Sequence, residues 1–267
     1  MTHDPDSDSA AVSVTVDLVI FTVRDDELQV LLVERGKAPY LGQLALPGGH
    51  LRGKETLDGA ALRELKEETG IDGAHLHLEQ LRTYSDPQRD PRGRVITAAY
   101  LALGPNLPVP VAGTDAREAY WMPVGTALHD HMLAFDHVSI LGDALERARS
   151  KLEYTTVATA FCPEPFTVTD LRRVYEVIWG SALDPSNFRR KITRADGFLE
   201  PTGQHRIPAT GRPASLYRKG PASLLMPPFL RPHDTTRAEF TSLQPQQTKP
   251  CLLLGEAGVV RVEEIGP

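Results

Sequence analysis

The sequence has little of several features that would set it apart from ordinary globular proteins. Its only two cysteines, Cys162 and Cys251, are too few for a disulfide framework and too far apart for a zinc knuckle. No run approaches the roughly eighteen apolar residues of a membrane span. The acidic start MTHDPDSDSA lacks the basic and apolar segments of a secretory signal. We therefore expect a cytoplasmic protein with free thiols and no membrane partner.

The charge of the chain is distributed unevenly along its length. The 267 residues have a net charge of −6, and there is room for one large domain or two ordinary ones. Residues 1–150 contain 14 basic and 23 acidic side chains, whereas residues 151–231 contain 12 basic and 7 acidic ones. An acidic first part and a basic second part indicate two domains with different partners, unless the difference is ordinary fluctuation.

The first half of the chain alternates between strand and helix patterns. Residues 1–12 are expected to form a disordered tail. Residues 13–23 alternate and are rich in β-branched residues, and residues 28–36 follow the turn RDDE as a second strand, which predicts a hairpin. A helix is predicted from Leu57 to Thr69, with Gly70 as its C-terminal stop. Further strands are predicted over 81–86, 94–103 and 118–124, so a mixed α/β domain over residues 13–132 is expected.

The second half has the element order of a winged helix-turn-helix. Residues 133–155 have a helical period, with an apolar stripe, and form a linker helix in this interpretation. Helices are predicted over 166–180, starting near Thr167 or Thr169, and from Pro185 onward. A hairpin with a basic loop follows at 198–220. We expect this domain over residues 156–231 and assign no role to the tail, residues 232–267.

The stretch LPGGHLRGKETLDGAALRELKEETGI, residues 46–71, has two glycine-rich interpretations. Gly48, Gly53 and Lys54 have the spacing of a Walker-type phosphate loop. That loop requires Ser or Thr after the lysine to bind Mg²⁺, and this chain has Glu55 there. It also requires a parallel sheet, whereas a hairpin precedes this stretch. The Walker interpretation is therefore set aside.

The alternative is a carboxylate site on the predicted helix. Glu64, Glu67 and Glu68 stand at i, i+3 and i+4 and share one helix face. Three adjacent negative charges are unfavourable without a counter-ion. Hard carboxylate oxygens suit Mg²⁺ or Mn²⁺, which in turn hold phosphate oxygens. Taken alone, the triplet is equally typical of a solvated helix face.

The full pattern resembles the Nudix box at every defined position. It runs from Gly49 through Glu55 and Arg63-Glu64-Leu65 to Glu67-Glu68 and Gly70-Ile71. The resemblance implies a mixed-sheet Nudix fold that splits a diphosphate with Mg²⁺ and water. It implies that Glu64, Glu67 and Glu68 are metal ligands and catalytic residues, that Glu55 and Arg63 brace the loop, and that Gly48 and Gly49 approach the phosphates. The sequence leaves open which carboxylate takes the proton of water; Glu118 is a second candidate.

Four further segments resemble a narrower group, the Nudix-related transcriptional regulators. They are SDPQRDPRGRVITAAYLAL, LAFDH, KLEYTT and NFRRKI, in this order. Members of that group commonly repress genes of NAD biosynthesis and sense ADP-ribose. The resemblance implies a homodimer that binds double-stranded operator DNA. Arg89 and Arg94, which lie in the first segment, are assigned with Gly48 and Gly49 to the ligand.

The basic second domain fits DNA on its own chemistry. Arg and Asn side chains read base edges, and Arg or Lys contact phosphates. A short helix and the predicted wing concentrate such residues. The candidates are Asn187, Arg189, Arg190, Lys191, Arg194, His205, Arg206, Arg212, Arg218 and Lys219. The alternative is that they merely balance the acidic domain.

Two functions remain open from the sequence. The first is an ADP-ribose-sensing repressor, supported by the basic domain. The second is an ADP-ribose or nucleoside-diphosphate pyrophosphatase whose winged helix serves dimer contacts, supported by the intact box. His129, His131 and His137 have no common zinc spacing. We expect the first two to be exposed, and His137 to pack or hydrogen-bond at the start of the helix.

Overall fold

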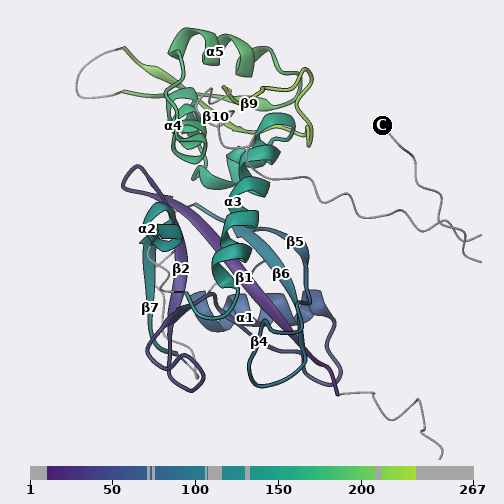
Figure 1. The fold of residues 1–267 in the computed structure, drawn as a ribbon. Coiled ribbons are helices and arrows are strands. Elements are labelled where there is room, and N and C mark those ends of the chain that lie inside the picture. Colours follow the sequence, from purple (N-terminus) through teal and green to yellow (C-terminus); the bar gives the residue numbers. More distant parts are fainter. Residues whose placement is uncertain are drawn as a thin grey trace, which may run out of the picture. The chain divides into compact units, whose positions relative to one another are not determined.

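A computed structural model describes residues 11–70, 73, 76–105, 107, 116–129, 133–207 and 212–232. The first part is a seven-stranded mixed sheet, in which β3-β2-β1-β6-β5 are neighbours, β4 pairs with β1 and β7 pairs with β2 (Figure 1). The strands are β1 (Ser13–Arg24), β2 (Glu27–Arg35), β3 (Leu44–Ala45), β4 (Gly48–His50), β5 (His77–Tyr84), β6 (Val95–Leu103) and β7 (Ala116–Pro123).

The predicted first hairpin is confirmed. β1 and β2 pair antiparallel, from Phe21 opposite Val30 to Arg24 opposite Glu27. Asp25 and Asp26 make the turn with positive φ angles of 51° and 62°. Two such residues match the right-handed twist of the strands that they join. β1 also pairs parallel with β6 along most of its length, which places it at the centre of the sheet.

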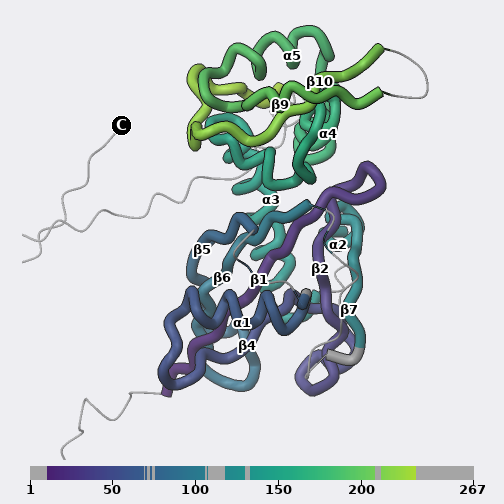
Figure 2. Tube along the Cα trace, turned by 180° about the vertical axis from the view of Figure 1, so that it is seen from behind, coloured from purple at the N-terminus to yellow at the C-terminus, as the bar shows by residue number. Residues whose placement is uncertain are grey.

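Two helices cover opposite faces of this sheet. Helix α1 (Leu57–Thr69) lies before the sheet in Figure 2, and α3 (His137–Tyr154) lies before it in Figure 1. Alternate residues of β1 divide between them: Leu18 and Ile20 pack with Leu65 of α1, whereas Val19 and Phe21 share a core with α3. A central position buried on both faces explains the unbroken apolar run Leu18–Phe21 in β1 and the almost wholly apolar sequence of β6.

Helix α1 has the ends that the sequence predicts. The Thr56 side chain accepts a hydrogen bond from the Gly59 N–H, and Gly70 ends the helix in a left-handed conformation with φ of 71°. These caps fix where the helix begins and ends, and the three glutamates lie on one face of it.

Helix α3 does more than link two domains. The predicted apolar stripe is buried, and it packs on the sheet as a second helical layer: Ile140, Leu141, Ala144, Leu145 and Ala148. The helix begins at His137, because Phe135 has a positive φ of 57° and cannot continue a right-handed helix. A shorter helix, α2 (Val124–His129), precedes it.

The remaining elements form a winged helix. A 3-10 helix η3 (Val157–Phe161) leads to β8 (Phe166–Thr167), α4 (Val168–Trp179), α5 (Pro185–Arg194), β9 (Leu199–Arg206) and β10 (Ala214–Lys219). The three strands form a separate sheet in the order β8-β10-β9. Thr167 and Asp170 form a capping box at the start of α4, and Asp184 caps α5 ahead of Pro185.

The segment after β10 completes the core of the winged helix. Phe229 is buried and contacts the rings of Tyr175, Trp179 and Phe188, with ring centroids 5.2–5.5 Å apart. The tail beyond residue 232, like residues 1–10, lies outside the described residues. None of the helices in the described part of the chain is long and apolar enough to cross a membrane.

Candidate functional site

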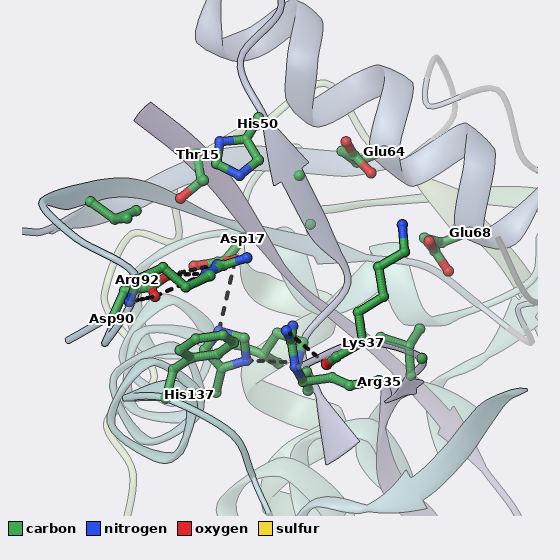
Figure 3. Close-up of a pocket in the computed structure, with 18 of the residues that line it drawn as sticks. Thr15, Asp17, Arg35, Lys37, His50, Glu64, Glu68, Asp90, Arg92 and His137 are labelled. Atoms are coloured by element: carbon green, nitrogen blue, oxygen red, sulfur yellow. Dashed lines mark hydrogen bonds and ion pairs between the residues drawn. The ribbon is translucent and has the colours of Figure 1, made fainter. Parts of the chain in front are cut away.

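A cavity of about 410 Å³ opens between the Nudix-box helix and the start of α3. Its wall combines both signs of charge. In Figure 3, Glu64 and Glu68 project from α1, across from Asp17, Arg92 and His137. This volume is in the range of small-molecule sites in proteins. The cavity therefore has the size and polarity for a charged ligand of nucleotide dimensions.

The acidic wall comes from one face of α1. Glu64, Glu67 and Glu68 all line the cavity; the first and third are buried, whereas the Glu67 side chain is 41% exposed. Burial raises the pKa of the Glu64 carboxyl, although a hydrogen bond from Arg63 opposes that shift. A cation bound here would offset the cost of burying this charge.

Gly48 and Gly49 bring the backbone close to this wall. A methyl group at Gly49 would collide with the carboxylate of Glu64, and one at Gly48 would collide with the carbonyl oxygen of Val16. Only glycine fits against the backbone at Gly48, and at Gly49 any larger residue would push the Glu64 carboxylate out of its place, so the strand β4 lies directly against the acidic helix.

Arg63 ties the loop before α1 to the helix itself. Its guanidinium donates to both carboxylate oxygens of Glu55, at 2.8 and 3.0 Å, and to Glu64 at 2.5 Å. It also reaches the carbonyl oxygen of His50 at 3.3 Å. The hydrogen bond from Arg63 lowers the pKa of Glu55 to about 2. Five donors in a fixed plane allow one arginine to hold loop, strand and helix together.

The donor chemistry of the acidic wall fits a hard divalent cation. Three carboxylates and a close glycine backbone line one cavity. Glu67 is turned toward Arg63 and Arg52, at 3.3 and 3.4 Å. In the described part of the chain, no three potential metal ligands have converged on one point. A cation would therefore have to draw Glu67 away from the arginines.

The floor of the cavity is a buried ion network centred on Arg89. Its side chain, 4% exposed, donates to both oxygens of Asp136 at 2.7 and 2.9 Å and to Asp17 at 3.3 Å. Next to it, the imidazole Nδ1 of His137 accepts a hydrogen bond from the Leu46 N–H at 2.9 Å. Burial lowers the pKa of His137, which keeps the ring neutral. This agrees with the hydrogen-bonding role that we expected for His137.

The basic wall is built around the ring of Phe135. The guanidinium groups of Arg35 and Arg92 lie 4.6 and 5.4 Å from its centroid, and Tyr40 meets it edge-on at 4.8 Å. Arg92 is paired with Asp90 at 2.6 Å. Arg35 donates only to backbone carbonyl oxygens in the described part of the chain. Burial, together with the charge of Arg92, lowers the pKa of Arg35.

The structure separates the residues that the sequence assigned to the ligand. Gly48, Gly49 and Arg89 line the cavity. Arg94 does not; its guanidinium donates to the Ser85 carbonyl at 2.7 Å. Glu118 is exposed, bonded to the Tyr120 hydroxyl and away from the cavity, and His129 is exposed and bonded to the Gly125 carbonyl at 2.6 Å. His131 lies outside the described residues.

The second candidate surface is the outer face of α5. Phe188 and Ile192 are buried, whereas the polar residues around them on the helix are exposed: Asn187, Arg189, Arg190, Lys191 and Arg194. Arg190 donates to the Asn187 side chain at 2.8 Å, and the Lys191 ammonium lies 4.7 Å from the Phe229 ring. Arg212, Arg218 and Lys219 are exposed beside the wing, and Arg206 pairs there with Asp170 at 2.9 Å. The arrangement presents a cationic surface without carboxylates on the outer face of the helix.

Comparison with known proteins agrees with both halves of this description. The model of the NUDIX domain matches residues 14–142, and that of the NrtR DNA-binding winged helix domain matches residues 158–218. The ADPR responsive transcriptional repressor NtrR of Acinetobacter baylyi is 37% identical over 214 residues, which cover 79% of this chain and 84% of that protein. This chain belongs to the NrtR family of Nudix proteins. The fold class and the family resemblance inferred from the sequence are confirmed.

Solved structures of the NrtR family share the fold over most of the chain. Shewanella oneidensis NrtR complexed with a 27mer DNA is 36% identical, with a TM-score of 0.67, and the match covers 78% of this chain and 94% of that one. The Nudix half is also similar to an ADP-ribose pyrophosphatase of Methanocaldococcus jannaschii, 38% identical over 133 residues, which cover 49% of this chain and 72% of that protein.

Sequence reasoning missed the basic wall of the NrtR-type cavity. Arg35 ends a strand, Arg92 sits in a polar loop, and Phe135 precedes a helix, so no spacing along the chain connects them. The only available signal for Arg92 was its place in PQRDPRGR, where Arg89 and Arg94 were chosen instead.

Proposed function

We propose that this chain is a transcriptional repressor that binds operator DNA through its winged helix and ADP-ribose through its Nudix cavity. One observation carries the proposal: a polar cavity of nucleotide size and an exposed cationic recognition helix occur in one chain. The relative from Acinetobacter baylyi, named as ADPR responsive, and the Shewanella oneidensis structure with DNA support both halves.

In this proposal the ligand's diphosphate lies between the two walls of the cavity. Glu64, Glu67 and Glu68 would hold Mg²⁺ or Mn²⁺, and that cation would supply neutralisation of phosphate charge and a more acidic water. The backbone of Gly48 and Gly49 contacts the phosphates. Glu55 and Arg63 keep the acidic wall in place, and Arg89 orients the floor through Asp17 and Asp136.

On the DNA side, α5 enters the major groove. Asn187, Arg189 and Arg190 read base edges, because they project from the exposed face of the helix. Lys191 and Arg194 contact the backbone, and the wing adds Arg206, Arg212 and Lys219. The protein acts as a homodimer on paired half-sites.

A second activity, hydrolysis of ADP-ribose, is favoured by the intact Nudix box. All three box glutamates line the cavity, and the Methanocaldococcus jannaschii relative is an ADP-ribose pyrophosphatase. A protein with both activities would destroy the signal that it senses. Operator binding by the winged helix would then return as the Nudix cavity consumes the ligand.

The test is fluorescence anisotropy with DNA from upstream of the chain's own gene and its neighbours, in moderate salt with excess competitor DNA. ADP-ribose and Mg²⁺ are then added, and AMP release is followed in the same samples. Sequence-dependent binding that ADP-ribose weakens at least about tenfold, or about 1.4 kcal/mol, is expected. Weak binding that follows ionic strength alone would contradict the repressor.

Paired variants separate the two activities. Replacing Glu67 and Glu68 with Gln should abolish AMP release while operator binding persists. Replacing Arg189 and Arg190 with Ala should do the reverse. Loss of both activities in either variant would show that the two sites are not independent.

A further inference from the structure

The turn that forms one wall of the cavity is also the first turn of α3. Ala134, Phe135, Asp136 and His137 follow one another, and the last two residues are the cap and first residue of the helix. The Ala134 N–H bonds to the Leu44 carbonyl at 2.8 Å, which fixes the turn to strand β3. Phe135 and His137 line the cavity. A ligand that contacts this wall therefore contacts the start of α3.

The backbone of this turn is strained. Phe135 has a φ of 57°, and Tyr40, whose ring meets it edge-on, has a φ of 63°. Bulky residues rarely adopt this left-handed region, and they persist there only where surrounding contacts hold them. Two strained aromatic residues from different loops thus support each other at the cavity edge.

Two of the contacts that hold Phe135, besides the rings of Tyr40 and His137, are ones that an anion can weaken. Arg35 and Arg92 place their guanidinium groups at its ring, 4.6 and 5.4 Å from the centroid. Both arginines line the cavity; Arg92 is ion-paired with Asp90 at 2.6 Å, whereas Arg35 forms no ion pair within the described ranges. A charge-assisted hydrogen bond from guanidinium to phosphate is stronger than a partly solvated cation–π contact. A diphosphate in the cavity would therefore draw Arg35 away from the ring and compete with Asp90 for Arg92.

The other end of α3 is built into the winged helix. The Trp179 indole N–H donates to the Arg149 carbonyl at 3.0 Å, and the Arg149 guanidinium donates to the Ile178 carbonyl at 3.0 Å. Leu152 shares the buried core with Leu171 and Tyr175 of α4. A helix is a rigid element, so a displacement at its first turn is carried to the elements packed on its last turns.

We propose that Phe135 and Asp136 are the residues that couple the cavity to the winged helix. An anion at Arg35 and Arg92 releases Phe135 from its left-handed conformation. The start of α3 then shifts, together with the Arg89–Asp136 pair, and α4 and α5 move with the helix. The inference rests on the proposed function, since it names the path by which ADP-ribose changes operator affinity.

The test compares coupling factors, not affinities. For each full-length protein, operator Kd is measured without ligand and at ADP-ribose concentrations that calorimetry shows to be saturating for that protein, with ligand consumption monitored. The ratio of the two Kd values is the coupling factor, and linkage requires DNA to change ADP-ribose affinity by the same ratio. Phe135→Leu removes the ring and keeps apolar volume; Asp136→Asn weakens the pair with Arg89.

Two controls change other contacts of the same elements. Asp143→Asn alters a contact between α3 and β5, away from the cavity, where Asp143 accepts from Tyr84 at 2.8 Å. Asp26→Asn alters the ion pair between the β1–β2 turn and Arg173 of α4. Thermal unfolding verifies that every variant is folded.

We expect a wild-type ratio of about tenfold or more, reduced to within about threefold of unity in Phe135→Leu and Asp136→Asn and retained in both controls. Wild-type ratios in the first two variants would overturn the inference. A collapse of the coupling factor in Asp143→Asn or Asp26→Asn would also overturn it. Either result would mean that coupling is lost on any loosening of these elements, or that it depends on a contact other than the one proposed. A wild-type ratio of unity would instead refute the proposed function, and the coupling path with it.

Discussion

At the scale of single residues, burial distinguishes side chains that look alike in the sequence. Arg89 and Arg94 lie in one polar loop, and both were assigned to the ligand. Arg89 is buried between Asp17 and Asp136, whereas Arg94 is only half-buried and bonded to one backbone carbonyl. The first therefore determines whether the cavity floor exists, and the second contributes little to it.

This difference predicts unequal effects of the same substitution. Arg89→Met leaves the buried carboxylate of Asp17 and the half-buried one of Asp136 without their cation, and loss of one partner of a buried ion pair costs about 3–5 kcal/mol. Arg94→Met changes a half-buried side chain that makes one hydrogen bond, and it should lower the free energy of unfolding by about 1 kcal/mol or less. Urea unfolding of both variants measures the contrast. Equal losses would mean that Arg89 is not the centre of the floor.

The sequence could predict the acidic wall but not the basic one, for a physical reason. Glu64, Glu67 and Glu68 lie within five residues on one helix, so helical geometry alone places them on one face. Arg35 and Phe135 are a hundred residues apart in sequence, and they meet through loops with positive φ angles at Tyr40 and Phe135. No residue type there signals such a backbone, since glycine is absent at both positions.

At the scale of elements, α3 is held on the sheet by polar contacts at its edge as well as by its apolar stripe. Glu79 of β5 accepts from Lys151 of α3 and lies 3.5 Å from the Arg147 guanidinium. It also pairs with His77 at 3.0 Å. Burial alone would raise the pKa of Glu79, but the hydrogen bonds from His77 and Lys151 lower it to about 2.

The depressed pKa makes this contribution to stability dependent on pH. A carboxyl group whose pKa is lower in the folded state stabilises the fold above its unfolded pKa, here 4.5, and the effect is lost as the pH falls toward about 2. After allowance for solvent screening, Glu79→Gln should lower the free energy of unfolding by roughly 1–2 kcal/mol near neutral pH.

The difference between Glu79→Gln and wild type should shrink progressively below about pH 4.5. Urea unfolding at several pH values measures it, with Glu200→Gln, at an exposed position of β9, as the matched control. A difference that stays constant down to the lowest pH at which the protein folds would show that the charge of Glu79 does not hold α3.

The elements themselves were largely predictable, because their ends carry local signals. Thr56 and Gly70 delimit α1, Thr167 and Gly180 delimit α4, and Pro185 opens α5. The role of α3 was less accessible. Its stripe predicts a buried face, but periodicity does not say against what that face packs, and the sheet and the winged helix share it.

At the scale of the whole molecule, the acidic part and the basic part of the chain each contain one of the two candidate binding surfaces. The acidic first part contains the cavity, and the basic second part presents α5 and the wing. One winged helix contacts a short stretch of major groove, and non-specific attraction to phosphates supplies much of its affinity. Specificity therefore depends on the proposed homodimer, which adds a second half-site at a fixed distance.

The dimer predicts a dependence on helical phase. Half-sites for a symmetric dimer lie on one face of the duplex, about 10–10.5 base pairs or a multiple of this apart. Inserting about 5 base pairs between them turns one half-site to the opposite face, and we expect operator affinity to fall at least about tenfold. Inserting about 10 should restore part of it, because the faces realign at a longer distance. Anisotropy at constant salt measures the series, with Arg189→Ala/Arg190→Ala as the non-binding control. Equal affinity for all spacings would mean that a monomer reads one half-site, and that the sensing cavity acts on each winged helix alone.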